Sequence, residues 1–308
     1  MRGVGLNAVS GRRQQQLDGL QARPHRLPER AWLQRRLSSL RAPILYGTAW
    51  KQERTAHYVD IALRAGFRGF DTACQPKHYD EAGVGAGIEA CSELGLKRSA
   101  LYLQTKFTPL GGQDPQRMPY DPRAPLPQQI EQSCARSLEN LRTDYLDALL
   151  LHSPLSNGAE TLRAWRMLEE LVERGNVRNI GISNCYQLDE LQQLWQAAHI
   201  KPTVLQNRFY RDSDYDAQLR AFCRAHAITY QSFWTLTANK QLLKHGALIA
   251  AAAAHRRSVE QILFRYLTQR QVVPLTGTRS EQHMREDLAI LEFELTPEEL
   301  LQIDRLLQ

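Results

Sequence analysis

Residues 70–81 read FDTACQPKHYDE, and the interpretation of the whole chain starts from this stretch. An apolar run ends at the carboxylate of Asp71, a polar loop follows, and a helix is predicted after the loop. Barrel enzymes present catalytic groups in this way, with an acidic residue at the carboxyl end of a strand and further polar groups in the loop that follows. Three later segments also place polar residues at the ends of predicted strands: Lys106, His152 and the pair Ser183-Asn184. We expect these strand ends to converge on one site.

The chain alternates between short apolar runs and amphipathic stretches. Apolar residues recur at three- and four-residue spacing in stretches such as 58–65 and 130–141, which predicts helices between the runs. Strand-helix alternation implies parallel pairing through right-handed crossovers. Eight runs are predicted as strands: 44–49, 69–73, 101–107, 147–153, 177–184, 203–208, 228–234 and 271–277.

Two architectures fit such an alternation, an open doubly wound sheet and a closed barrel. The first strand-helix turn of an open nucleotide-binding sheet normally carries a glycine-rich phosphate loop. The corresponding turn here, residues 47–51, reads GTAWK and lacks that pattern. We therefore predict an α/β fold of the (β/α)8 TIM-barrel type, formed as a single domain by residues 42–308, which matches the usual barrel size.

The net charge of +6 is concentrated at the start of the chain. Residues 1–41 hold nine arginines against Asp18 and Glu29, whereas residues 42–308 hold 30 basic and 31 acidic residues. The predicted barrel is thus close to neutral, which argues against a nucleic-acid partner. Residues 1–41 are predicted to be a poorly ordered or appended basic extension. Two interpretations stay open for them, a solvated segment that is helical around 27–40 and an organellar targeting peptide.

The five cysteines, an odd number without CxxC spacing, predict neither a disulfide framework nor a zinc site. This usage fits a reducing compartment, and we expect a cytoplasmic protein. No apolar run reaches the roughly 18 residues of a membrane span, so we expect no membrane association. We also expect a monomer.

The strand-end residues suggest one kind of chemistry. A tyrosine has an ordinary pKa of about 10, and a lysine ammonium beside Tyr79 is expected to lower it. Asp71 is expected to hold Lys106 as a cation, and His152 to hydrogen-bond the oxygen of a substrate. These groups form a proton donor without a nucleophile or a metal-ligand set, so a hydride-carrying cofactor is implied. Taken singly, each has a plain alternative: a helix cap for Asp71, a surface lysine for Lys106 and a strand cap for His152.

From about residue 44 to 307 the chain resembles the aldo-keto reductases, barrel enzymes that use a nicotinamide cofactor. The motifs that carry this resemblance are GFDTA at 69–73, TK at 105–106, YLDALLLHSP at 145–154, GISN at 181–184 and LQN at 205–207. The resemblance implies that Tyr79 is the general acid, that Asp71 and Lys106 adjust its pKa, and that His152 orients the carbonyl group.

The resemblance also implies a set of cofactor-binding residues. Those at the nicotinamide carboxamide are Ser183, Asn184 and Gln206, with Ser232 near the pyrophosphate. Those at the adenosine end are Thr276, Thr278, Arg279, Glu286 and Asp287. Family members that prefer the phosphorylated cofactor carry Lys and Arg where this chain has Gly277 and His283, and Arg279 is a candidate replacement. NADPH is therefore expected only because it is the usual cofactor of the family, and NADH is the alternative.

Two further features depart from the family pattern. Tyr79 follows Asp71 by eight residues instead of five, which leaves His78 as a rival for its role. Gln231 occupies the position of the aromatic residue that stacks on the nicotinamide, so Phe233 or Tyr230 would have to replace it.

The predicted substrate pocket is lined by Trp50, Phe233 and Trp234 and by the proline-rich loop at 108–127. An open aromatic rim of this kind predicts small aldehyde or ketone substrates without strong selection. The leading hypothesis is reduction of a carbonyl to an alcohol by an NADPH-dependent oxidoreductase. The alternative is a largely non-catalytic protein on the same fold that senses or binds the nicotinamide cofactor.

Overall fold

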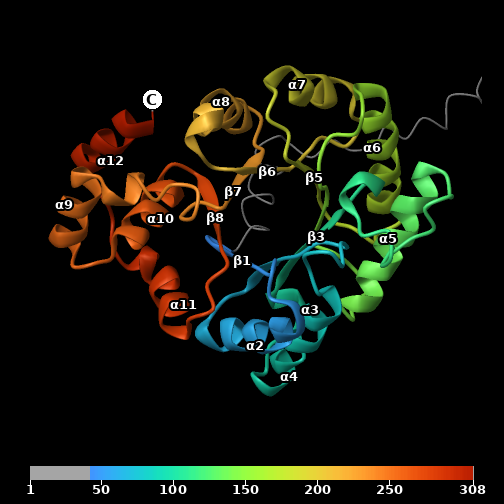
Figure 1. Ribbon diagram of the computed structural model, residues 1–308, viewed down its shortest axis with the longest axis horizontal. Helices are drawn as coiled ribbons and strands as arrows, with labels where there is room; N and C mark the ends of the chain where they lie inside the picture. Colours follow the sequence, from blue (N-terminus) through green and yellow to red (C-terminus); the bar gives the residue numbers. More distant parts are fainter. Residues whose placement is uncertain (1–41, 308) are drawn as a thin grey trace, which may run out of the picture. The chain divides into compact units, whose positions relative to one another are not determined.

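A computed structural model of the protein describes residues 42–307. In this part of the chain the strands form a closed parallel barrel in sequence order, β1 to β8, with β8 pairing back onto β1 (Figure 1). The strands are β1 Leu45–Gly47, β2 Gly69–Asp71, β3 Tyr102–Phe107, β4 Ala148–Leu151, β5 Ile180–Ser183, β6 Val204–Arg208, β7 Thr229–Phe233 and β8 Val272–Thr276. The predicted (β/α)8 barrel is confirmed, with each strand inside its predicted run.

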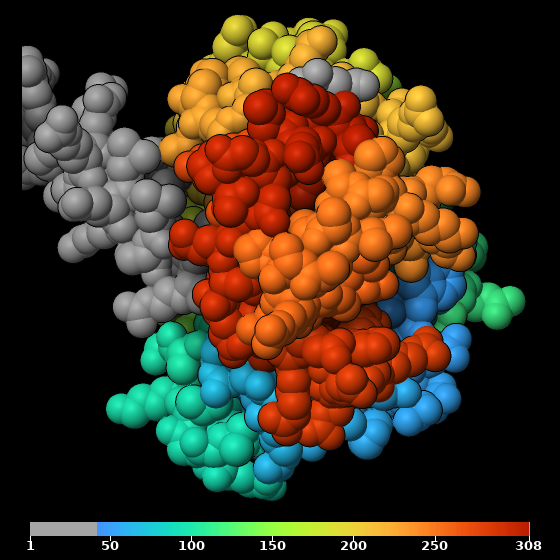
Figure 2. All heavy atoms as spheres, turned by 90° about the vertical axis from the view of Figure 1, so that its left-hand side faces the viewer, coloured from blue at the N-terminus to red at the C-terminus, as the bar shows by residue number. Residues whose placement is uncertain are grey.

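Helices surround the barrel (Figure 1). They are α2 Thr55–Ala65, α3 Glu81–Ile88, α4 Ala90–Glu93, α5 Leu126–Asn140, α6 Gly158–Glu173, α7 Leu188–Ala197, α8 Ala217–Ala225, α9 Gly246–His255, α10 Val259–Gln269, α11 Glu281–Leu288 and α12 Pro297–Asp304. Short 3₁₀ helices are η1 Gln52–Arg54, η2 Arg98–Ala100, η3 Leu110–Gly112, η4 Arg211–Asp216, η5 Leu242–Lys244, η6 Ala289–Glu292 and η7 Arg305–Leu307. Helices α9 to α12, in orange and red, cover one side of the barrel (Figure 2). None of the described helices is long and apolar enough to cross a membrane.

Local sequence explains where several helices begin. Thr296 caps α12, its hydroxyl accepting from the Glu299 amide while the Glu299 carboxylate accepts from the Thr296 amide, and Pro297 follows at the first helical position. The α-helical part of this segment ends at Asp304, and the 3₁₀ helix η7 follows directly. Gly85 of α3 packs against the backbone of Asn140, where a Cβ atom would clash. The predicted extension, residues 1–41, lies outside the described part.

The barrel interior changes from apolar to polar along the strands. Tyr102, Gln104 and Lys106 alternate along β3, and successive residues of a strand point to opposite faces. At one level Tyr102 packs in a buried apolar cluster with Leu45, Leu150 and Val204. Above it, Gln104 and Lys106 reach Asp71, which pairs with Gln104 in the β2–β3 register. The interior therefore has an apolar floor and a buried polar layer, and the catalytic candidates belong to that layer.

Candidate active site

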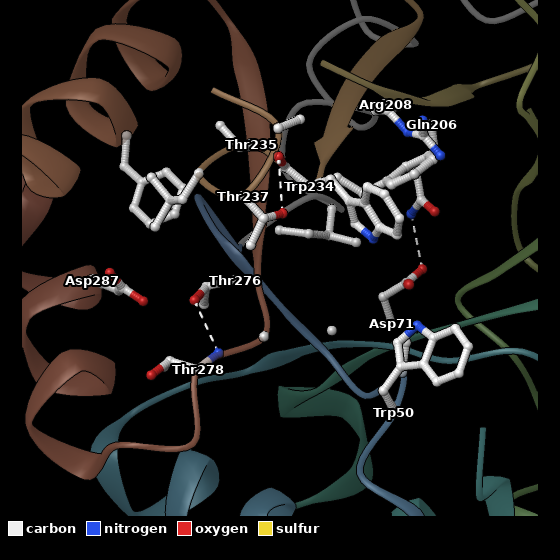
Figure 3. Close-up of a pocket in the computed structure, with 18 of the residues that line it drawn as sticks. Trp50, Asp71, Gln206, Arg208, Trp234, Thr235, Thr237, Thr276, Thr278 and Asp287 are labelled. Carbon is white, nitrogen blue, oxygen red and sulfur yellow. Dashed lines mark hydrogen bonds between the residues drawn. The ribbon is translucent and has the colours of Figure 1, made fainter. Parts of the chain in front are cut away.

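A cavity of about 1210 Å³ opens at the carboxyl ends of the strands. Figure 3 shows Asp71, Gln206 and Arg208 at one end and Thr276, Thr278 and Asp287 at the other. Its lining includes fourteen of the predicted site residues: Trp50, Asp71, Tyr79, His152, Ser183, Asn184, Gln206, Phe233, Trp234, Thr276, Thr278, Arg279, Glu286 and Asp287. The structure thus brings together residues that are more than 200 positions apart in the sequence. Two predicted residues, Lys106 and Ser232, do not line it.

Lys106 lies directly beneath the cavity as half of a buried ion pair. Its Nζ donates to Asp71 Oδ1 at 2.8 Å and Oδ2 at 2.7 Å, and to the Thr72 carbonyl at 2.8 Å. Burial lowers the pKa of the Lys106 ammonium, and the Asp71 carboxylate opposes that shift. The predicted pairing is therefore present, which excludes the alternatives of a surface lysine and a helix-capping aspartate.

Tyr79 lies beside both Lys106 and His152. The Lys106 Nζ is 5.5 Å from the centroid of the Tyr79 ring, and the centroids of the Tyr79 and His152 rings are 6.0 Å apart. Burial raises the pKa of the Tyr79 phenol, and the negative charge of Asp71 raises it further. Our expectation of a lowered pKa was wrong, because burial and the Asp71 carboxylate outweigh the effect of the Lys106 ammonium. The phenol is consequently protonated at neutral pH.

The His152 imidazole is neutral in this environment. Burial lowers its pKa to about 3, and the nearby Lys106 and His78 contribute to the same shift. Its Nδ1 atom lies 2.6 Å from the hydroxyl of Thr108. When the Thr108 hydroxyl donates to Nδ1, the proton of the neutral ring is on Nε2.

His78, the rival of Tyr79, has a different environment. Its ring packs on Trp50 at an interplanar angle of 34° with centroids 3.8 Å apart, and the Trp50 amide donates to its carbonyl at 2.8 Å. The longer loop after β2 turns tightly, because the amides of His78 and Tyr79 both donate to the Gln75 carbonyl. This turn takes up the three extra residues and brings the Tyr79 ring next to Lys106.

The residue at the stacking position, Gln231, is fully buried in a network of amides. Its Oε1 accepts from Gln104 Nε2 at 2.8 Å and Gln206 Nε2 at 2.9 Å, and its Nε2 donates to Gln104 Oε1 at 2.9 Å. Tyr230 cannot replace a stacking residue, since it is buried and its hydroxyl donates to Asp216. Of the two predicted substitutes, Phe233 is therefore the one that lines the cavity.

The predicted carboxamide-binding residues meet at the ends of β5 and β6. Gln206 Nε2 donates to Asp71 Oδ1 at 2.9 Å, the bond drawn in Figure 3, and no described residue donates to its Oε1. The Ser183 hydroxyl donates to the Gln206 carbonyl, and Asn184 Nδ2 donates to the His152 carbonyl. Asn184 adopts a left-handed backbone conformation with φ of 52°. A free amide oxygen beside these groups is what the NH₂ of a carboxamide requires, so this end fits a nicotinamide ring.

The predicted residues at the other end differ in their access to the cavity. Ser232 is fully buried and its hydroxyl accepts from Thr235 Oγ1 at 2.9 Å, whereas Thr235 itself lines the cavity. The contact of Ser232 with a pyrophosphate stays a prediction, since its hydroxyl is buried against Thr235 and the residue is not part of the cavity lining. Arg279 is exposed and donates to the Trp50 carbonyl at 2.6 Å.

Asp287 is a buried carboxyl group at this end, and burial raises its pKa from 3.8 to about 7. Between these two pH values the folded protein binds a proton that the unfolded chain has released, so its stability falls as the pH rises toward 7. We expect Asp287→Asn to raise the free energy of unfolding by about 1–4 kcal/mol at pH 8, and by less as the pH approaches 4. Urea denaturation at several pH values measures this, with the exposed Glu298→Gln as a control. An equal gain at every pH would contradict the assignment.

Sequence reasoning missed three side chains that shape the site. Gln104 completes the amide network, Thr108 contacts His152, and Arg208 lines the cavity next to Gln206. Arg208 was detectable in the sequence, since it is a charged residue at the end of a predicted strand. Gln104 was not, because its partners Gln206 and Gln231 come from strands whose register is known only in the fold.

Comparisons with known proteins agree with this architecture. The family model described as Aldo/keto reductase family matches residues 43–243 and 234–308. Glyoxal reductase from Bacillus subtilis is 33% identical over 252 residues, which cover 80% of this chain and 82% of the relative. NADPH-dependent D-xylose reductase from Meyerozyma guilliermondii is 27% identical over 296 residues, covering 83% and 88%. The crystal structure of an aldo/keto reductase from Brucella melitensis superposes with a TM-score of 0.71 and 26% identity, covering 86% of this chain and 94% of that one. The matched motifs, the barrel and these relatives show that the chain belongs to the aldo/keto reductase family of nicotinamide-dependent oxidoreductases.

Proposed function

We propose that the protein reduces an aldehyde or ketone to an alcohol with NADPH, and that Tyr79 is the general acid. The observation that carries this proposal is the position of a protonated Tyr79 beside the Lys106 ammonium and the His152 ring. The cofactor, when bound, supplies a hydride to the carbonyl carbon. The residues of the chain then have to bind the carbonyl oxygen and deliver a proton to it.

Tyr79 is suited to donate that proton. Its raised pKa keeps it protonated at neutral pH, so a proton is available when negative charge develops on the oxygen. Lys106 lies beneath the ring and stabilises the phenolate that forms when the proton leaves. Asp71 holds Lys106 in place through two hydrogen bonds.

His152 is suited to orient the carbonyl group. A neutral ring whose Nδ1 accepts from Thr108 presents its Nε2–H as a hydrogen-bond donor. Such a donor, aimed at the oxygen, stabilises the charge that develops there. Because the pKa of His152 is about 3, this role does not change across the physiological pH range.

NADPH is proposed over NADH on two grounds. Arg279 places an exposed guanidinium at the start of α11, and its planar fork suits a phosphate. One relative in the comparisons is named as NADPH-dependent. Ser183, Asn184 and Gln206 are proposed to bind the carboxamide, and Thr276, Thr278, Glu286 and Asp287 the adenosine end.

Small carbonyl compounds are the proposed substrates. The rim holds two exposed indoles, Trp50 at 51% and Trp234 at 50% exposure, with Phe233 between the rim and the interior. The names of the relatives refer to glyoxal and xylose, both of which carry aldehyde groups. A cytoplasmic monomer is proposed as well, and the five free, buried cysteines agree with a reducing compartment.

A two-stage experiment tests the proposed function. Fluorescence titration with NADPH and with NADH gives the two dissociation constants, and steady-state oxidation of the tighter cofactor with a panel of aldehydes gives turnover. We expect tighter binding of NADPH and measurable turnover with several small aldehydes. A cofactor that binds while no aldehyde is turned over would instead support the cofactor-sensing alternative.

A further inference from the structure

Arg208 is a charged residue in the catalytic cavity that the mechanism above does not use. It is the last residue of β6 and follows Gln206 by two positions, so both side chains lie on the same face of the strand. Both line the cavity, and Figure 3 shows them together at the end that also holds Asp71. An arginine at this position therefore faces the ligand that occupies the cavity.

The guanidinium of Arg208 has no polar partner among residues 42–307. No hydrogen bond or ion pair from its side chain occurs there, and its Nε atom is buried without an acceptor. A guanidinium stays protonated in proteins and has five N–H donors. The side chain as a whole is half-buried, but leaving its buried Nε donor unpaired is costly, so an anion from another molecule would satisfy it.

Aromatic contacts hold the unpaired guanidinium in place. Its carbon lies 4.3 Å from the centroid of the Trp234 ring and 5.2 Å from that of Tyr210. Stacking of this kind orients the planar group without using its N–H donors. Trp234 adopts a left-handed backbone conformation with φ of 55°, which directs its indole over the cavity beside Arg208.

No carboxylate in the described cavity compensates this charge. Asp71 is neutralised by Lys106 at 2.7 Å. Asp212 also lines the cavity, but it is exposed to water and forms no ion pair within residues 42–307. Asp287 lies at the opposite end, next to Thr276 and Thr278 (Figure 3), and the remaining two carboxylates of the lining, Glu260 and Glu286, lie near Asp287 and contribute to its raised pKa.

We propose that Arg208 binds the anionic group of the substrate, and that the preferred substrates are aldehydes or ketones that carry a carboxylate or a phosphate. The planar fork of arginine matches both groups through two parallel hydrogen bonds. The position of Arg208 beside Gln206 and Asp71 places this anion near the reacting carbon and away from the adenosine end. This inference rests on the proposed carbonyl reduction. A phosphate of the cofactor would accept the same hydrogen bonds, so the experiment must distinguish it from an anionic group of the substrate.

A matched pair of substrates tests the proposal. 4-Carboxybenzaldehyde and 4-nitrobenzaldehyde have planar substituents of similar size, but only the first is an anion. We expect the wild-type protein to prefer the carboxylate. In Arg208→Gln the ratio of the two kcat/KM values is expected to fall by about 10–100-fold, which is typical of a lost charged hydrogen bond. Arg208→Lys retains the charge without the fork and should give an intermediate ratio.

Binding measurements keep the test independent of turnover. Quenching of tryptophan fluorescence gives the dissociation constants of 4-carboxybenzaldehyde, NADPH and NADH for each variant. Weaker binding of 4-carboxybenzaldehyde with unchanged binding of both cofactors supports the proposal, even in a preparation that turns over no aldehyde. In that case only the proposed reduction fails. The exposed Arg211→Gln, outside the cavity lining, should leave the ratio and all three constants unchanged.

Three results would overturn the assignment. Equal weakening of NADPH and NADH with an unchanged substrate ratio would show that Arg208 binds the cofactor diphosphate, and weakening of NADPH alone would indicate its additional phosphate. Unchanged constants for every ligand would show that Arg208 binds no anion.

Discussion

Replacing Tyr79 by phenylalanine is expected to lower kcat for aldehyde reduction by about 10³-fold, within the usual range for a lost general acid. The substitution removes only the hydroxyl, so the ring that lies 5.5 Å from Lys106 Nζ remains. The dissociation constant of NADPH should therefore change little. Steady-state kinetics and a fluorescence titration on the same preparation measure both quantities.

His78→Ala is the companion variant, because His78 is the other candidate in the loop after β2. Its ring packs against Trp50, so its loss should loosen the cavity rim and raise KM more than it lowers kcat. Normal turnover in Tyr79→Phe, or a larger loss of kcat in His78→Ala, would show that Tyr79 is not the general acid.

The second large effect is expected from Lys106→Met, on stability as well as activity. Asp71 would keep hydrogen bonds from Gln104 at 2.6 Å and Gln206 at 2.9 Å, but its charge would be buried without a counter-ion. Breaking a buried ion pair in this way typically costs about 3–5 kcal/mol of folding free energy. Urea denaturation measures the loss, and we expect reduction to be abolished at the same time.

The double variant Asp71→Asn with Lys106→Met separates the two effects. It removes both charges and leaves an amide that Gln104 and Gln206 can still hydrogen-bond, so most of the lost stability should return. Activity should not return, because no ammonium then lies beside Tyr79. Restored turnover in the double variant would mean that the ion pair has a structural role only.

The local sequence was sufficient to predict the barrel. Periodicity placed all eight strands, because an apolar run bounded by polar residues is recognisable without knowledge of its partners. It also placed Asp71, Lys106 and His152 at strand ends, and the parallel arrangement then brought those ends to one mouth. The sequence left His78 as an alternative to Tyr79, because the loop has three extra residues, and the turn at Gln75 in the structure accounts for them.

Properties that depend on several strands could not be predicted. Burial and the Asp71 carboxylate raise the pKa of Tyr79 and outweigh the nearby Lys106 ammonium, a balance of distances that no spacing in the sequence encodes. Gln231 hydrogen-bonds the amides of Gln104 and Gln206, whereas Ser232, one residue later, hydrogen-bonds Thr235. Arg208 is a charged strand end in the sequence, but only the fold shows that it has no counter-ion among residues 42–307.

The amino-acid sequence by itself determined the barrel, the family and the set of polar residues at its mouth, because periodicity and motifs are properties of neighbouring residues. The tertiary structure alone decided which of these residues are charged, neutral or unpaired. Those states follow from desolvation and from distances of a few ångströms between segments that are remote along the chain.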